Sequence, residues 1–266
     1  TVLIYGEQGM GDEIMFASML PDILKTNKVV LECYARLETL FKKSFPGVPV
    51  YGTREDPEIN WAYDHKMDAR LAIGSLGKFY RRSRDAFPGN PYLSADSLPK
   101  GDKFRIGISW TGGGLKEGRV RKRSVPLNWW KPILDIPNVE FVSLQYTESK
   151  EELDVMEALG YPIKHMDEAK AKDYYETASL VKSCDLVISV ATTVIHLAGA
   201  LGVKCWVMVP HWPAWRYLNK GPMPWYRSVR LYRSPSPDQE AWKLVIDRVT
   251  EDLSNLVSGK SKLRVA

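Results

Sequence analysis

One segment, residues 185–210 (DLVISVATTVIHLAGALGVKCWVMVP), constrains the fold of this 266-residue chain most strongly. Residues 185–190 form a short apolar run rich in β-branched side chains, residues 192–201 have the pattern of a helix, and residues 204–209 form a second apolar run. Two apolar runs of strand length joined by a helix predict a strand-helix-strand unit of a parallel sheet. The chain is therefore expected to belong to the α/β class.

The start of the expected helix at residues 192–201 is a candidate ligand site. In such a unit the helix begins at the carboxyl edge of the sheet, where its free backbone N–H groups and its positive end favour a phosphate. Thr192 and Thr193 supply hydroxyl groups at this start, and His196 follows about one turn later at the same end. An ordinary capped core helix with a hydrogen-bonded histidine is the alternative interpretation of the same residues.

Length and composition limit the possible classes of protein. A chain of 266 residues with 44% hydrophobic and 26% charged residues is typical of a globular protein of two domains. No apolar run approaches the roughly 20 residues that span a bilayer, and the N-terminal residues lack a signal-peptide pattern, so we expect no transmembrane segment and a cytoplasmic location. Cys33, Cys184 and Cys205 lack metal-ligand spacing, so we expect buried free thiols with neither a disulfide nor a zinc site.

A glycine-containing loop, GEQGMGDE, follows the first predicted strand at residues 1–6 and precedes a predicted helix. Gly9 and Gly11 let the backbone approach a ligand closely, as in dinucleotide-binding turns, although the spacing is not the G-x-G-x-x-G fingerprint. Asp12 lies at the start of the helix, so its carboxylate is expected at the cleft face of the sheet. The aspartate is either a first-turn charge favoured by the helix dipole or a catalytic group.

Residues 87–102 are rich in proline, glycine, serine and aspartate, a composition that marks a linker. We therefore expect a first domain at residues 1–100 and a second at residues 101–266, because the alternation of strand and helix patterns continues on both sides. The second domain begins with a predicted strand at residues 104–110. The last predicted helix, at residues 238–257, could cross back to the first domain.

The net charge of +5 is unevenly distributed, because the whole basic surplus lies in residues 101–266. Residues 116–123 (KEGRVRKR) contain five basic side chains and follow the predicted strand at 104–110. A solvated face, a nucleic-acid patch and an anion clamp are all compatible with such a run. Its position beyond the carboxyl end of a strand favours the anion clamp. No nucleic-acid partner is expected, because the chain lacks a known nucleic-acid motif.

Ordered sequence blocks extend along nearly the whole chain: YGEQGMGDEIMFASMLPDI, PYLSAD, IGISWTGG, RKRSVPL, FVSLQY, DLVISVATTVIHLAGALGVKCWVMVP, PAWRYL and PWYRSVRLYR. In this order they resemble bacterial heptosyltransferases, glycosyltransferase family nine, and most of all the glycosyltransferase domains found downstream of tetratricopeptide repeats. The resemblance implies a GT-B architecture, in which two Rossmann-like domains face each other across a cleft. It places the acceptor on the first domain and a nucleotide sugar on the second, and it implies inverting transfer without a metal or other cofactor.

The resemblance also implies roles for single residues. Asp12 matches the proposed general base, which takes the proton of the acceptor hydroxyl as the new bond forms. Without a metal, basic side chains and a helix dipole must stabilise the charge of the leaving group. The donor-binding candidates are the basic position Arg123, the helix start at Thr192 and Thr193, His196 in the HLAGAL block, and Thr111 and Gln145 at strand ends.

One position departs from the family pattern, which has an aspartate before the threonine of the opening segment. The aspartate is thought to hold hydroxyl groups of the donor sugar, whereas this chain has Ala191, which cannot accept those hydrogen bonds. An altered donor, a protein that binds without turnover, or an introduced substitution would each explain the alanine. Two hypotheses follow: a glycosyltransferase that modifies a glycan or, with upstream repeats, a protein, and a catalytically silent module that binds a nucleotide or sugar or scaffolds a partner.

Overall fold

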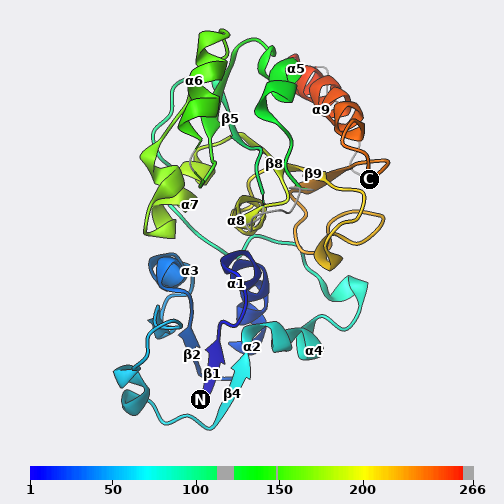
Figure 1. The fold of residues 1–266 in the computed structure, drawn as a ribbon. Helices are drawn as coiled ribbons and strands as arrows, with labels where there is room; N and C mark the ends of the chain where they lie inside the picture. The colour runs from blue at the N-terminus through cyan, green and yellow to red at the C-terminus, as the bar shows by residue number, and fades with distance from the viewer. Residues whose placement is uncertain (113–122, 148, 260–266) are drawn as a thin grey trace.

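The computed structural model describes residues 1–112, 123–147 and 149–259, and these form two lobes, each built on one parallel sheet (Figure 1). The sheet of the first lobe has the order β3-β2-β1-β4, and that of the second lobe has the order β10-β9-β8-β5-β6-β7. The strands are β1 (Val2–Tyr5), β2 (Val29–Glu32), β3 (Val50–Tyr51), β4 (Ala69–Ala72), β5 (Phe104–Ser109), β6 (Val139–Ser143), β7 (Ile163–Lys164), β8 (Leu186–Val190), β9 (Cys205–Val209) and β10 (Val229–Arg233). This arrangement confirms the predicted α/β fold with two Rossmann-like sheets.

Helices connect the parallel strands in both lobes. The α-helices are α1 (Met10–Phe16), α2 (Leu20–Ile23), α3 (Glu38–Ser44), α4 (Gly77–Tyr80), α5 (Lys131–Leu134), α6 (Lys150–Ala158), α7 (Tyr174–Lys182), α8 (Thr193–Leu201) and α9 (Ala241–Val257). The short 3-10 helices are η1 (Ala17–Met19), η2 (Ala35–Leu37), η3 (Asn60–Asp64), η4 (Ile73–Leu76), η5 (Arg84–Ala86), η6 (Leu127–Trp130), η7 (Asp167–Lys170) and η8 (Trp215–Tyr217). No helix of the described residues has the length and apolar character needed to cross a membrane.

The strand-helix-strand unit predicted from residues 185–210 is β8, α8 and β9. Both strands are buried along their whole length, and they pair in parallel with Val187 opposite Cys205. Apart from its first residue, α8 is also completely buried. The helix ends at Gly202, whose φ of 74° lies in the left-handed region that glycine adopts without a steric penalty. The apolar runs were therefore sufficient to predict this unit, because each of its elements is enclosed.

Helix α8 packs against α1 of the first lobe, so that the two lobes meet helix to helix (Figure 1). The contact is close: a Cβ atom on Gly11 of α1 would lie 3.3 Å from His196 Cδ2 and 3.3 Å from Thr193 Oγ1. Buried side chains of both lobes, including Ile14 on α1 and Ile195 on α8, belong to one continuous hydrophobic core. A site at this contact is therefore built by both lobes.

Residues 87–103 contain neither helix nor strand, and they run along the second lobe before β5 begins. The backbone N–H groups of Tyr92 and Leu93 both donate to the carbonyl of Ala200 on α8, at 3.0 and 3.1 Å. The expected linker is thus fastened to the helix that the first lobe contacts. The strands of the first sheet precede this linker in the sequence, and the strands of the second sheet follow it.

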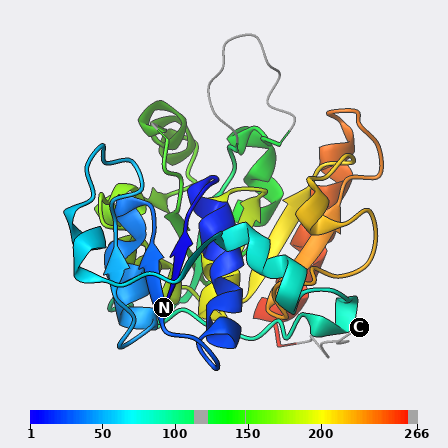
Figure 2. The same ribbon diagram turned by 90° about the horizontal axis from the view of Figure 1, so that it is seen from below.

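The last helix, α9, packs within the second lobe. Its buried face, which includes Trp242 and Val249, joins a core with Trp130 of η6, and the helix also contacts α5 and β10. Seen from below, α9 (orange to red) lies beside the yellow strands of the second sheet and apart from the blue strands of the first (Figure 2). The helix therefore does not cross back to the first lobe, because its apolar face is already covered by its own lobe.

Candidate active site

A cavity of about 210 Å³ lies between the lobes, where the loop after β1 meets the start of α8. In the second sheet β8 and β5 are neighbours, and the chain order reverses between them. Ligands of open α/β sheets bind outside the carboxyl ends of strands at such a switch point. The cavity is lined by Gly9, Met10, Gly11 and Asp12 of the first lobe and by Arg123, Tyr146, Ala191, Thr192, Thr193, His196, Arg216 and Tyr217 of the second.

Seven of the nine candidate residues selected from the sequence line this one cavity, although they come from three distant parts of the chain. They are Gly9, Gly11, Asp12, Arg123, Thr192, Thr193 and His196. Arg123 is exposed and is the first described residue after the gap, and the remainder of the basic run, residues 116–122, lies outside the described residues. The cavity thus combines a carboxylate from one lobe with cationic and helix-terminal groups from the other.

Thr111 and Gln145 do not line this cavity. The Gln145 side chain is completely buried, where Oε1 accepts hydrogen bonds from Ser109 Oγ at 3.1 Å and from the N–H of Thr111 at 3.1 Å. Its Nε2 donates to the Thr111 carbonyl at 3.0 Å. Gln145 therefore joins the ends of β5 and β6, and its contact with a ligand stays a prediction.

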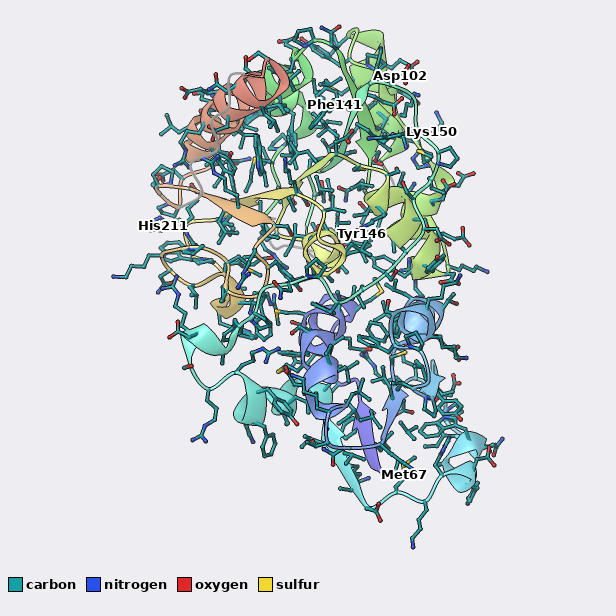
Figure 3. All side chains as sticks on the ribbon, turned by 180° about the vertical axis from the view of Figure 1, so that it is seen from behind. Met67, Asp102, Phe141, Tyr146, Lys150 and His211 are labelled. Atoms are coloured by element: carbon teal, nitrogen blue, oxygen red, sulfur yellow. The ribbon has the colours of Figure 1, made fainter. Side chains whose placement is uncertain are left out.

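Thr111 lines a second cavity, of about 540 Å³, at the same edge of the second sheet. Consecutive residues line the two cavities: Arg123 lines the first and Ser124 lines the second. In Figure 3, His211 of the second cavity lies toward the outer edge of the second lobe, and Tyr146 of the first lies near α8. The second cavity is further lined by Val125, Pro126, Glu152, Pro210, Trp212, Ser234, Ser236, Pro237, Asp238, Gln239 and Trp242.

Asp12 and Arg216 form an ion pair across the boundary between the lobes. Asp12 lies in the first turn of α1, and its Oδ1 accepts a hydrogen bond from Nη2 of Arg216 in η8. Both side chains are mostly enclosed, with 18% and 17% of their surface exposed. The Nε of Arg216 is buried and has no hydrogen-bond partner among the described residues. Sequence reasoning did not select Arg216, and its position in the PAWRYL block beyond β9 was the only available signal.

His196 is buried beneath the cavity and is uncharged near neutral pH. Burial, together with the smaller effect of the nearby positive charge of Arg216, lowers the pKa of the His196 imidazole to about 3. His196 Nδ1 lies 3.1 Å from the hydroxyl of Tyr226, which lies 3.4 Å from the hydroxyl of Tyr92. The Tyr92 hydroxyl donates to the Ile14 carbonyl of α1 at 2.6 Å. Hydrogen-bonding groups therefore link α8 to α1 beneath the site.

The start of α8 has no side-chain cap. Thr192 occupies the N-cap position with an extended backbone, but its hydroxyl lies 3.1 Å from Ser189 Oγ and does not bond to the backbone of the helix. The first N–H groups of an α-helix lack partners within the helix, so they are available to a ligand or to water. The helix is otherwise the core helix of the alternative interpretation, with a hydrogen-bonded His196, but it lacks the side-chain cap, so its donors and the positive end of its dipole lie at the cavity.

A second buried ion pair fixes the loop that leads into α1 and Asp12. Glu13 is 1% exposed, its Oε2 accepts the Tyr34 N–H at 2.9 Å, and its Oε1 pairs with Arg54. Arg54 also donates to the carbonyl of Gln8. Burial raises the pKa of the Glu13 carboxyl, while the Tyr34 N–H and Arg54 oppose that rise. A Cβ atom on Gly6 would lie 2.4 Å from the Glu13 carboxylate, so only glycine leaves room for this pair.

Ala191, whose side chain is a single methyl group, lines the cavity and is 4% exposed. The three predicted free thiols, Cys33, Cys184 and Cys205, are buried and unpaired. Within residues 1–112, 123–147 and 149–259, no three histidine, cysteine, aspartate or glutamate side chains gather as a metal site would require.

No family model matches the chain. Protein FlbA of Caulobacter vibrioides is 33% identical over 285 aligned residues, which cover 97% of this chain but only 47% of FlbA. The chain therefore spans about half the length of this curated relative.

Several solved glycosyltransferase structures are similar to this chain over almost its whole length. E. coli heptosyltransferase WaaC with ADP has 14% identity and a TM-score of 0.61, and the match covers 96% of this chain and 99% of WaaC. E. coli ADP-heptose lps heptosyltransferase II has 12% identity and a TM-score of 0.65, covering 98% and 99%. A glycosyl transferase family 9 structure from Veillonella parvula has 9% identity and a TM-score of 0.60, covering 93% and 89%. The chain therefore has the GT-B type of fold that heptosyltransferases have.

Proposed function

We propose that this protein is an inverting glycosyltransferase that moves a sugar from a nucleotide-activated donor to a hydroxyl group of a glycan or a protein. One observation carries the proposal: Asp12 of the first lobe shares a cavity with Arg123, Arg216 and the uncapped start of α8. The similarity to E. coli heptosyltransferase WaaC, which was solved both with ADP and with ADP-2-deoxy-2-fluoro heptose, supports a nucleotide sugar as the donor.

The proposed reaction is a direct displacement at the anomeric carbon. The acceptor oxygen forms a bond to this carbon on the face opposite the nucleotide, and the bond from the carbon to the phosphate oxygen breaks. Asp12 takes the proton of the acceptor hydroxyl, as a general base within hydrogen-bond reach would. The leaving phosphate gains negative charge, which Arg123 and the α8 N–H groups stabilise without a metal ion.

The two cavities divide the substrates between them in this proposal. The cavity of about 540 Å³ contains Trp212 and Trp242, and apolar or aromatic walls with a few polar groups suit a nucleoside. The phosphates extend past Ser124 and Arg123 to the start of α8, and the acceptor enters from the loop that contains Gly9 and Gly11. A cytoplasmic location and an upstream repeat domain stay predictions from the sequence.

The catalytically silent alternative rests on Ala191. An aspartate at this cavity wall would accept hydrogen bonds from a sugar, whereas the methyl group of alanine does not. In that case the protein binds a nucleotide or sugar, or scaffolds a partner, and transfers nothing. Turnover that appears only after Ala191→Asp would favour this alternative.

Release of free nucleotide from a panel of nucleotide sugars, with and without hydroxyl acceptors, tests the proposal. We expect wild-type protein to release nucleotide, with unchanged turnover in EDTA, and Asp12→Asn to lose about 100-fold or more of the rate. The control is Asp154→Asn, which removes a carboxylate with 58% of its side chain exposed on α6. Equal turnover of Asp12→Asn and wild type would refute the role of Asp12, and binding without turnover would support the silent module.

A further inference from the structure

We propose that Arg216 changes partner during the reaction and thereby couples donor binding to the availability of Asp12. In the free protein Arg216 forms an ion pair with the carboxylate of Asp12. On donor binding, the guanidinium moves to a phosphate oxygen of the donor. Asp12 Oδ1 is then free to accept the proton of the acceptor hydroxyl. This inference rests on the proposed function, since it assigns Arg216 as a positioning residue at the same site.

The first support is the location of Arg216. It lies in η8, which follows β9 of the second lobe, yet its guanidinium contacts a carboxylate of the first lobe. Arg216 lines the same cavity as Arg123 and the start of α8, where the proposed phosphates bind. A small movement of its side chain is therefore sufficient to exchange one oxygen ligand for another.

The second support is the incomplete hydrogen bonding of the guanidinium. Its Nη2 donates to Asp12, whereas its Nε is buried without a partner among the described residues. A buried N–H without an acceptor is unfavourable, and a phosphate can accept from Nε and Nη2 together as a bidentate ligand. The arrangement is thus better satisfied by a phosphate than by the single Asp12 oxygen.

The third support is the anchoring of η8 on the first lobe. The ring of Trp215 lies 6.4 Å from that of Phe16 on α1, stacked at 18°, and Arg216 Cζ lies 5.7 Å from the centre of the Trp215 ring. The backbone next to Arg216 is therefore held close to α1 whichever oxygen the guanidinium contacts. A general base must reach the proton that it takes, so Oδ1 of Asp12 is not available to the acceptor hydroxyl as long as Arg216 donates to it.

A double-mutant cycle on nucleotide affinity tests the exchange of partners. Calorimetry is carried out with ADP, GDP, UDP and TDP, and the nucleotide that binds wild type most tightly is used for Asp12→Asn, Arg216→Gln and the double variant. We expect Asp12→Asn to tighten binding about fivefold, because Arg216 no longer has to leave a carboxylate. Arg216→Gln should weaken binding at least about tenfold.

The decisive result is the double variant. In the Arg216→Gln background, the exchange predicts that Asp12→Asn has little further effect, because there is no arginine left to release. If Asp12→Asn tightens binding equally in both backgrounds, the effect is simple charge repulsion and the inference is wrong. Unchanged affinity of Arg216→Gln also contradicts it.

Two further measurements keep the outcome interpretable. Thermal unfolding of each variant checks that it is folded, and Arg216→Met, which removes the charge but keeps an aliphatic stem, replaces Arg216→Gln if that variant is unfolded. The cycle measures binding alone, so it can fail even if the protein transfers sugar. Absence of binding of any of the four nucleotides to wild type would instead contradict both proposals.

Discussion

At the scale of single residues, burial determines which groups at the cavity carry charge. Asp12 is partly exposed and paired with Arg216. His196 on α8 is buried, and its Nδ1 lies within hydrogen-bond distance of the Tyr226 hydroxyl. The loss of hydration and, to a smaller extent, the positive charge of Arg216 disfavour a charged imidazole. His196 therefore contributes hydrogen bonding and packing to the site, and no charge.

The neutral state of His196 predicts a pH dependence of stability. Its pKa is near 6.5 in the unfolded chain and about 3 in the folded protein, so below pH 6.5 the unfolded state binds a proton that the folded state excludes. The stabilisation is present above pH 6.5 and is lost as the pH falls toward 3. Between pH 7.5 and pH 5 the free energy of unfolding should fall by about 2 kcal/mol more for wild type than for His196→Gln.

Chemical denaturation at several pH values measures this difference. His165→Gln is the control, because this histidine lies on the surface with 40% of its side chain exposed. Its stability should follow the wild-type curve. Parallel curves for wild type and His196→Gln would show that His196 is not held neutral.

Sequence reasoning found most of the cavity but missed one of its charges. Asp12, Thr192 and His196 follow strands whose apolar runs are unmistakable, so their convergence at one sheet edge could be predicted. Arg216 lies in a loop after β9, and neither propensity nor periodicity specifies the path of such a loop. Gln145 was selected because it follows a strand end. A side chain at such a position can also bond to the neighbouring strand, as Gln145 does with Ser109 at the end of β5.

At the scale of elements, the loop between β1 and α1 depends on a buried ion pair from outside the motif. Glu13 is enclosed, and Arg54 reaches it from the segment after β3. Desolvation raises the pKa of Glu13, and its hydrogen bonds with Arg54 and the Tyr34 N–H oppose this. The glycine loop is therefore positioned by Arg54 as well as by its own conformation.

Removal of one partner of this pair should be costly. Arg54→Ala leaves a buried carboxylate without its cation and should lower the free energy of unfolding by about 3 kcal/mol. Glu13→Gln combined with Arg54→Met should recover part of this loss, because no buried charge is left unpaired. Denaturant titration of both variants measures the difference. Equal destabilisation by the single and the double variant would mean that packing, and not charge, determines the effect.

Elements with continuous burial could be predicted, and marginal ones could not. Strands β8 and β9 are buried throughout, so their runs stand out in the sequence. Strand β4 lies at the edge of the first sheet, and only one of its four residues, Ala72, is buried. Such a short strand has no alternation to detect. The lobe against which the last helix packs could not be predicted either, because an amphipathic pattern shows that one face is covered but not which lobe covers it.

At the scale of the whole molecule, the site exists because two sheets present their carboxyl edges to each other. The continuous core between α1 and α8 and the linker bonded to Ala200 hold the lobes in this relation. The GT-B fold could be inferred from ordered blocks along the chain. The ion pair between Asp12 and Arg216 depends on the exact approach of the lobes, which the sequence of neither lobe specifies alone.

The central claim is that an activated sugar binds between the lobes with its phosphates at the start of α8. A crystal structure of the protein with the nucleoside diphosphate that most raises its melting temperature tests this most directly. We predict phosphate oxygens within hydrogen-bond distance of the Thr193 N–H and the Arg123 guanidinium, with the nucleoside in the cavity lined by Trp212 and Trp242. Phosphates bound elsewhere, with the cavity between Asp12 and α8 left to solvent, would contradict the account.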